Sequence, residues 1–249
     1  MNLKTSVLLT RVFGAGILGF CLRTALYRFG FDEKNILSAT HPLHLACLGL
    51  TLWLLMILAP MIRRLKGSNH PVDNFPASPL RTIAALAAAV FTAVHGYHLI
   101  RDIGNLLDAL RAALAILAAV AMALSAIPNM PQKSIFGFLL GVVSVFFAVD
   151  MLCRYQVWSG NPQLPDYTFH VLACVLLTLC SYHRLAFHTG IGKRRTLLLC
   201  GLMGLYLCLL CAAGPDTRAF YLGGSCWAGA CLCRAKPPVE REESCDVPA

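Results

Sequence analysis

Long runs of apolar residues, separated by short polar segments, dominate the chain. Three runs, 43–62, 80–100 and 195–214, carry almost no charge. Because a helix needs about 20 mostly apolar residues to cross the hydrocarbon core of a bilayer, each run predicts a membrane-spanning helix. The apolar residues are continuous and do not alternate with polar ones, which excludes the strands of a membrane barrel. The sequence therefore predicts an all-α, polytopic transmembrane helix bundle.

Five further runs complete an expected bundle of about eight spans. They are 5–27, 106–127, 134–153, 167–187 and 219–233. The last run is shorter than a membrane crossing requires. Arg11 interrupts the first run and no small-residue cleavage pattern follows it, so we interpret this run as the first helix and not as a secretory signal.

The chain predicts one membrane domain and a polar tail. No loop within residues 1–233 is long and polar enough to form a separate domain. Residues 234–249 contain three prolines and four acidic residues, a composition that cannot bury enough apolar surface to order itself. We therefore expect a transmembrane domain over 1–233 and a flexible cytoplasmic tail over 234–249.

The formal charge of +9 predicts an orientation. If the N-terminus lies inside, 14 of the 21 Lys and Arg residues fall in cytoplasmic segments, while the other seven are balanced by seven acids. Lys and Arg in short loops stay on the cytoplasmic side. The distribution predicts a multi-pass protein of the cell membrane with both termini in the cytoplasm.

The basic clusters Arg63-Arg64-x-Lys66 and Lys193-Arg194-Arg195 lie in expected cytoplasmic loops. We interpret them as topology signals that contact anionic headgroups of the lipid bilayer. A cytoplasmic protein partner or a homo-oligomer is the alternative. Nucleic acid is not an expected partner, because the basic residues are spread over loops with no stripe of stacking aromatic side chains.

The motif His95-x-x-His98-x-x-x-Asp102 is the main candidate for chemistry. At about 3.6 residues per turn, its three side chains fall within about 60° of one helical face. In the expected topology they lie in the outer third of the bilayer, level with polar residues of three other helices. The residues of this candidate solute-binding set are Arg23, Tyr27, His95, His98, Asp102, Asp150, Arg154 and His170.

Ionisable side chains at this depth are costly unless they pair or face a cavity. Three interpretations follow. The set forms salt bridges that fix the register of the helices, or it lines an outward-facing pocket for a small solute. In the third interpretation His95, His98 and Asp102, completed by Asp150 or His170, hold a metal ion such as zinc, or the histidines bind haem. The sequence identifies no cofactor.

Small residues and cysteines form other patterns. Gly14-x-Gly16-x-x-Gly19 matches a dinucleotide-binding motif, but it lies within a hydrophobic helix, which favours close helix packing. The alanine-rich segments 84–93 and 109–126 predict a packed hairpin at the centre of the bundle. The cysteines at 208 and 211 and those at 231 and 233 lie at opposite ends of antiparallel helices, so they cannot form one four-cysteine site.

One N-terminal segment carries a resemblance. Leu22-Arg23-x-x-x-Tyr27-x-x-Gly30-x-Asp32-Glu33-Lys34, followed by His41-Pro42, resembles the opening of certain uncharacterised bacterial multi-helix membrane proteins. The resemblance implies a similar fold and no transferable catalytic residues.

The function that these patterns favour is a small-solute transporter or a membrane-embedded solute-binding subunit, with its site near the outer face. No nucleophile is visibly paired with a base, so a hydrolytic enzyme is not expected. The first alternative is a membrane enzyme or a metal- or haem-binding protein that uses the two histidines. The second is a structural or assembly factor that acts through its basic cytoplasmic face.

Overall fold

The structure is a computed structural model that describes residues 3–30, 41–63, 78–127, 134–158, 164–215 and 217–233. These residues form eight α-helices and no strand, which confirms the predicted all-α bundle. The helices are α1 (Leu3–Phe29), α2 (Pro42–Arg63), α4 (Pro79–Arg101), α5 (Leu106–Leu124), α6 (Ser134–Trp158), α7 (Leu164–His188), α8 (Arg194–Cys211) and α9 (Arg218–Leu232). The predicted tail, 234–249, lies outside the described residues.

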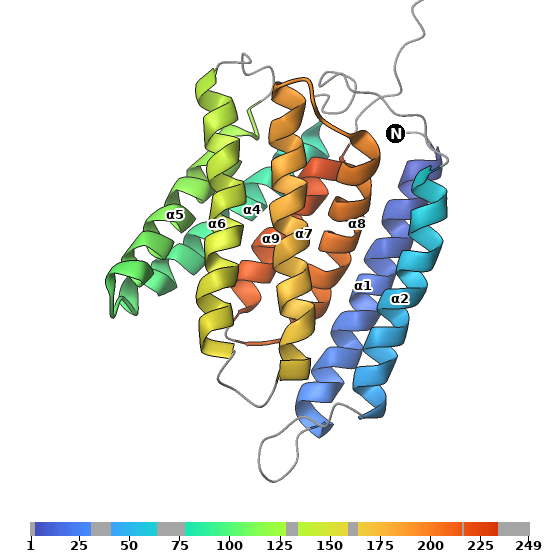
Figure 1. Cartoon of the computed structure of the whole chain (residues 1–249). Coiled ribbons are helices and arrows are strands. Elements are labelled where there is room, and N and C mark those ends of the chain that lie inside the picture. Colours follow the sequence, from blue (N-terminus) through green and yellow to red (C-terminus); the bar gives the residue numbers. More distant parts are fainter. Residues whose placement is uncertain are drawn as a thin grey trace, which may run out of the picture.

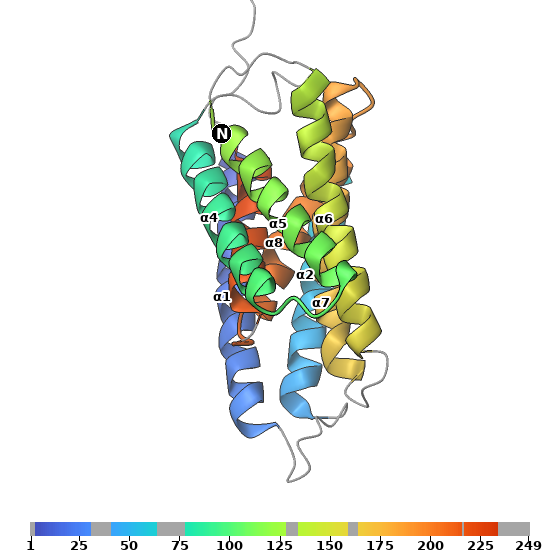
Figure 2. The ribbon, with the colours of Figure 1, turned by 90° about the vertical axis from the view of Figure 1, so that its left-hand side faces the viewer.

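Successive helices run in opposite directions through the bundle (Figure 1). We call the end at which α1 begins the N-terminal end; α4, α6 and α8 also begin there, and α2, α5, α7 and α9 end there. Figure 2, turned by 90°, shows that α1 and α2 extend furthest beyond the rest of the bundle at the opposite end.

Seven of the eight helices are long and apolar enough to cross a membrane, and α9 is the exception with 15 residues. Large apolar side chains such as Phe13, Met56, Ile83 and Leu172 are exposed on the outer faces of these helices. Lipid tails solvate such a surface, whereas water does not. The chain is therefore a multi-pass integral membrane protein whose apolar surface contacts the bilayer.

The last two helices form the centre of the bundle. Helix α8 is mostly buried, and α9 packs against α4, α7 and α8. A glycine allows the close approach of α9: a Cβ at Gly224 would lie 2.6 Å from Leu177 Cδ1 and 3.2 Å from Cys208 Sγ. Because other helices enclose α9, it does not have to cross the hydrocarbon core in contact with lipid. A helix of 15 residues is therefore long enough at this position.

The alanine-rich helices α4 and α5 pack against each other as predicted, but they do not lie at the centre. Their alanines, including Ala88 and Ala115, are buried between helices, while Val90 and Leu117 are exposed. Each helix thus has a small-residue face towards protein and a large apolar face towards lipid. The alanine content indicated close packing of the pair and not its position in the bundle.

The glycine motif of α1 packs against α8, in agreement with its interpretation as a helix contact. A Cβ at Gly16 would lie 2.5 Å from Leu209 Cδ1, and one at Gly19 would lie 3.2 Å from Leu210 Cδ1. Gly14 has no such neighbour. The motif stands within a continuous helix, which lacks the strand and turn that hold a pyrophosphate.

Helix α6 is longer than the predicted span 134–153, because it continues to Trp158. Asp150 and Arg154 stand one turn apart in the last part of this helix, and their side chains pair with each other. Pairing lowers the cost of placing charged groups at membrane depth, so the helix can continue through residues that the apolar pattern treated as its end.

Candidate functional site

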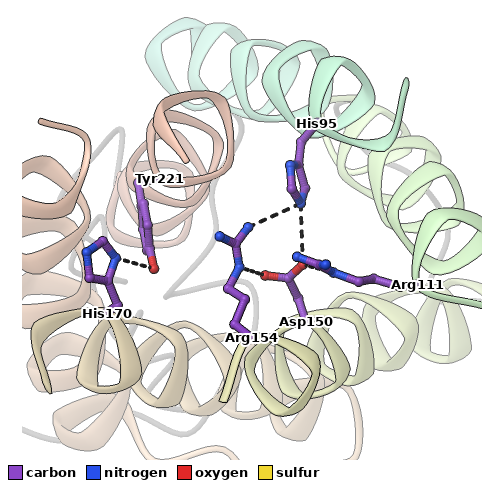
Figure 3. A network of polar contacts seen from close by, with 6 residues as sticks. All are labelled: His95, Arg111, Asp150, Arg154, His170 and Tyr221. Atoms are coloured by element: carbon purple, nitrogen blue, oxygen red, sulfur yellow. Dashed lines mark hydrogen bonds and ion pairs between the residues drawn. The ribbon is translucent and has the colours of Figure 1, made fainter. Parts of the chain in front are cut away.

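Four ionisable side chains from three helices meet near the opposite end of the bundle (Figure 3). Asp150 of α6 accepts hydrogen bonds from Arg154 Nε on its own helix at 2.5 Å and from Arg111 Nε of α5 at 2.5 Å. His95 Nε2 of α4 lies 3.3 Å from Asp150 Oδ1. We call these four residues the Asp150 cluster.

The local sequence explains how the three helices reach the same point. Arg154 stands one turn after Asp150 and so lies on the same face of α6. The turn between α4 and α5 is short, and Asn105 caps α5 by accepting a hydrogen bond from the Asp108 N–H at 2.9 Å. This cap starts α5 so that its second turn brings Arg111 to Asp150.

The cluster is buried and carries an excess of positive charge. The side-chain exposure of Asp150 is 0%, and that of Arg111 is 14%. Within the described part of the chain, Asp150 is the only carboxylate that pairs with Arg111 or Arg154. Two guanidinium groups and one carboxylate give a net charge of +1 while the imidazole is neutral. Burying charges costs several kcal/mol per ion, so this excess is energetically important.

His95 can adopt two hydrogen-bonding states within the cluster. Its Nε2 lies 3.3 Å from Asp150 Oδ1 and 3.5 Å from Arg154 Nη2. With hydrogen on Nε2 the imidazole donates to Asp150, and with hydrogen on Nδ1 it accepts from Arg154. A change of tautomer therefore exchanges the partner of His95 without moving the ring.

Aromatic rings close one side of the cluster. The Arg154 guanidinium lies 4.6 Å from the centroid of the Phe220 ring and 6.0 Å from that of Tyr221, both on α9. The His95 ring contacts Phe220 edge-on, with centroids 5.1 Å apart. Cation–π contacts stabilise a guanidinium in an apolar environment, so α9 holds Arg154 in place from the side opposite Asp150.

A second set of polar contacts connects α9 to α7 and α1. His170 Nδ1 lies 2.7 Å from the Tyr221 hydroxyl, and His170 Nε2 lies 3.1 Å from Arg23 Nη2. Since arginine only donates, His170 Nε2 accepts and Nδ1 carries the hydrogen that it donates to Tyr221. Arg23 also donates to the Tyr27 hydroxyl at 3.4 Å. Together with the Asp150 cluster, these contacts form a connected polar level that crosses the bundle from α1 to α5.

Six of the eight predicted site residues belong to this connected level: Arg23, Tyr27, His95, Asp150, Arg154 and His170. His98 and Asp102, in contrast, are exposed at the end of α4. Helical spacing places His95, His98 and Asp102 on one face, but only His95 lies deep enough to reach a neighbouring helix.

The predicted metal ligands are not brought together. His95 contacts Asp150, while His98 stacks edge-on against Tyr97 with centroids 6.1 Å apart. The described residues contain no group of three or more His, Cys, Asp or Glu side chains placed to hold a metal ion. In the Asp150 cluster the two carboxylate oxygens instead pair with two guanidinium groups.

Two residues of the site were not singled out from the sequence. Arg111 was counted only as one of the seven outer-side basic residues that seven acids balance, although it stands one turn inside α5. Tyr221 lies in the short final run 219–233, where no ionisable residue stands beside it to mark a polar site.

Comparisons of the chain with models of protein families, with curated proteins and with solved structures find no match. The resemblance of the N-terminal segment therefore stays a prediction, and function is inferred from the side chains of the site.

Proposed function

We propose that the protein is a small-solute transporter or a membrane-embedded solute-binding subunit, and that its solute is a small anion bound at the Asp150 cluster. One observation carries this proposal: two arginines from α5 and α6, whose side chains are 14% and 9% exposed, converge on a single carboxylate. The excess positive charge favours an anion over a cation or a neutral solute.

Low polarity around the cluster strengthens this preference. Opposite charges attract far more strongly in a water-poor interior than in water, so an uncompensated guanidinium there is a strong anion site. Arg111 uses only its Nε–H in contacts with described residues, which leaves its remaining N–H donors for a ligand. Planar guanidinium groups suit a carboxylate or another oxyanion especially well.

The hydrogen bonds within the Asp150 cluster can rearrange when an anion binds. An anion at Arg111 and Arg154 would compete with Asp150 for the same donors. His95 can then shift its hydrogen bond between Asp150 and Arg154, because both lie within 3.5 Å of its Nε2. Binding would therefore change contacts between α4, α5 and α6, which is the kind of coupling that transport requires.

A purely structural role is the second candidate, and a specific observation favours it. The charged groups of the cluster already pair with one another and are almost fully buried. Buried ion pairs can fix helix register without binding any ligand. This candidate predicts that the cluster affects stability alone.

Anion-dependent stabilisation of the purified protein separates the two candidates. The probes are chloride, nitrate, acetate and phosphate at constant ionic strength, and the readout is the midpoint of thermal unfolding in detergent. A ligand that binds only the folded state stabilises it by about 2.7 kcal/mol at 100 times its Kd. We expect a saturable increase with at least one anion, together with a bound species in native mass spectrometry.

Two matched variants complete the experiment. Arg111→Gln removes one guanidinium of the cluster and should abolish the saturable increase. Arg101→Gln removes an exposed arginine of α4 and should leave it unchanged. An increase that is equal in both variants, or no increase with any anion in the unmodified protein, would support the structural role and contradict the proposed function.

A further inference from the structure

A groove runs between α1 and α2 at the edge of the bundle. The two helices lie side by side, and α2 packs mainly against α1 and α8 (Figure 1). The groove has a volume of about 450 Å³, and residues of α1 and α2 alone line it. Every lining residue except Arg11 is apolar. We call this space the α1–α2 groove.

The α1–α2 groove has a buried floor and an exposed rim. Leu8 and Leu54 are buried at its floor, whereas Leu18 and Trp53 on its rim are about half exposed. An apolar surface of this kind is solvated by lipid tails and not by water. Its walls therefore suit a hydrocarbon chain.

Gly14 leaves open space in the α1 wall of the groove. A Cβ at this position would meet no heavy atom within 4 Å, whereas one at Gly16 or Gly19 would meet side chains of α8. Close packing of α1 against α8 thus accounts for the second and third glycines of the motif and not for the first. The missing side chain at Gly14 widens the groove instead.

Arg11 is the one ionisable residue among the described residues that line the groove. It is exposed, and it is the fourth residue of the apolar span that begins at Leu8. Neither α1, α2 nor α8 contains an Asp or a Glu. A charged side chain at membrane depth is costly unless it is paired. None of these three helices can supply the carboxylate, so an anion from the bilayer would stabilise Arg11.

The basic residues lie at one end of the groove. Arg11 stands in the half of the α1 wall that is nearer the N-terminal end of the bundle, and its long side chain can extend towards the headgroups. Helix α2 ends at the same end with the exposed Arg63, five residues or about 7.5 Å beyond Leu58 of the groove. The charge distribution predicts that this end faces the cytoplasm, where the leaflet contains anionic lipids.

We propose that the α1–α2 groove binds an anionic phospholipid. The phosphate pairs with Arg11 and is attracted by Arg63, while one acyl chain lies in the groove over Gly14. The basic end of the groove matches the headgroup, and its apolar walls match the chain. An anionic headgroup is preferred over a zwitterionic one because the site holds no acid to pair with a headgroup amine. The site is separate from the Asp150 cluster, which lies near the other end of the bundle.

Native mass spectrometry of the full-length protein in detergent tests the site. The probes are phosphatidylglycerol and phosphatidylcholine with identical acyl chains, each titrated to saturation. We expect the first bound lipid to be phosphatidylglycerol, with an affinity about fivefold or more above that of phosphatidylcholine, since a basic residue near the membrane surface adds about 1 kcal/mol of attraction. Equal affinities would mean that the protein holds only non-specific surface lipid, which would overturn the proposal.

Two pairs of variants separate the headgroup contact from the groove. Arg11→Gln should abolish the preference for phosphatidylglycerol, whereas Arg28→Gln, which removes an exposed arginine at the other end of α1, should retain it. Gly14→Leu fills the groove and should weaken binding of the first lipid. Gly49→Leu is its control, because a Cβ at Gly49 also meets nothing within 4 Å but this residue of α2 does not line the groove.

Three results would contradict the proposal. Full binding in Gly14→Leu would show that the headgroup is held without the groove. Loss of the preference in Arg111→Gln would assign the lipid to the Asp150 cluster. Size-exclusion chromatography verifies that each variant folds; if Gly14→Leu does not, Arg11→Gln is compared with Arg28→Gln, and equal affinity for phosphatidylglycerol is the third contradicting result.

Discussion

The two ends of the bundle bury arginine in different ways. At the opposite end Arg154 pairs with Asp150, whose carboxylate group carries a full negative charge in this ion pair. At the N-terminal end Arg184 donates to Cys231, a thiol that carries charge only after losing its proton. Both guanidinium groups also lie against an aromatic ring of α9, Phe220 at one end and Trp227 at the other.

The difference shows how the partner of a buried cation sets its possible chemistry. A carboxylate is inert to oxidation, so the Asp150 cluster can change only by exchanging partners or by binding an ion. A thiol can be oxidised and can form a covalent bond. The same aromatic support from α9 therefore serves an ion cluster at one end and an arginine–thiol hydrogen bond at the other.

The largest predicted effect of a substitution is at Asp150. Asp150→Asn leaves Arg111 and Arg154 buried without their carboxylate, and breaking a buried ion pair in this way costs about 3–5 kcal/mol. The thermal midpoint in detergent should fall steeply, or the protein should fail to accumulate. Asp102→Asn, at the exposed residue that follows α4, is the control and should leave the midpoint nearly unchanged. Equal midpoints for the two variants would show that the cluster is not energetically important.

Coupling within the cluster should be the next largest effect. A double-mutant cycle of Asp150→Asn with Arg154→Gln should give an interaction energy of about 1.5–3 kcal/mol, because each substitution removes the partner of the other. The same cycle of Asp150→Asn with Arg184→Gln should be additive, since the two sites lie at different ends of the bundle. Comparable coupling in both cycles would contradict the separation of the two sites.

Substitution at the N-terminal end should cost less. Arg184→Gln leaves Cys231 as a neutral thiol, which needs no counter-ion, so we expect a loss of about 1–2 kcal/mol from the hydrogen bond and the Trp227 contact. Thermal unfolding of the reduced protein measures it. A loss as large as that of Asp150→Asn would indicate that Cys231 is a permanent anion in the folded protein.

The smallest effect concerns the link between α7 and α9. Tyr221→Phe removes the hydroxyl that accepts from His170 Nδ1 at 2.7 Å. An unsatisfied buried donor costs about 1–3 kcal/mol, and we expect the lower part of this range because the aromatic packing of the ring is retained. Tyr97→Phe, at an exposed position, is the control. No difference between the two variants would remove His170 from the connected polar level.

Part of the fold followed from the sequence because the membrane imposes a simple pattern. Runs of apolar residues predicted the helices and their order, since every spanning segment must satisfy its backbone hydrogen bonds internally. The position of α9 did not follow, because a run of 15 residues is short for lipid and its enclosure depends on contacts with three other helices. Arg154 was expected to lie beyond its span, although its pairing with Asp150 allows α6 to continue.

The candidate site could be predicted only in part for a similar reason. His95, Asp150 and Arg154 were expected at one level from their depth along the helices, and the structure joins them. Helical periodicity also grouped His98 with His95, but a shared face does not ensure burial near the end of a helix. Arg111 was missed because it was counted only as a charge of the outer side, whereas the cap at Asn105 fixes it one turn inside α5.

Anomalous diffraction from crystals grown with bromide or with selenate tests the central claim most directly. These anions represent a halide and an oxyanion, and each can be located by its own scattering. We predict a peak in contact with Arg111 and Arg154 for at least one of them, and its loss in Arg111→Gln but not in Arg101→Gln. Peaks elsewhere on the protein with none at the Asp150 cluster would contradict the claim that this cluster binds an anion.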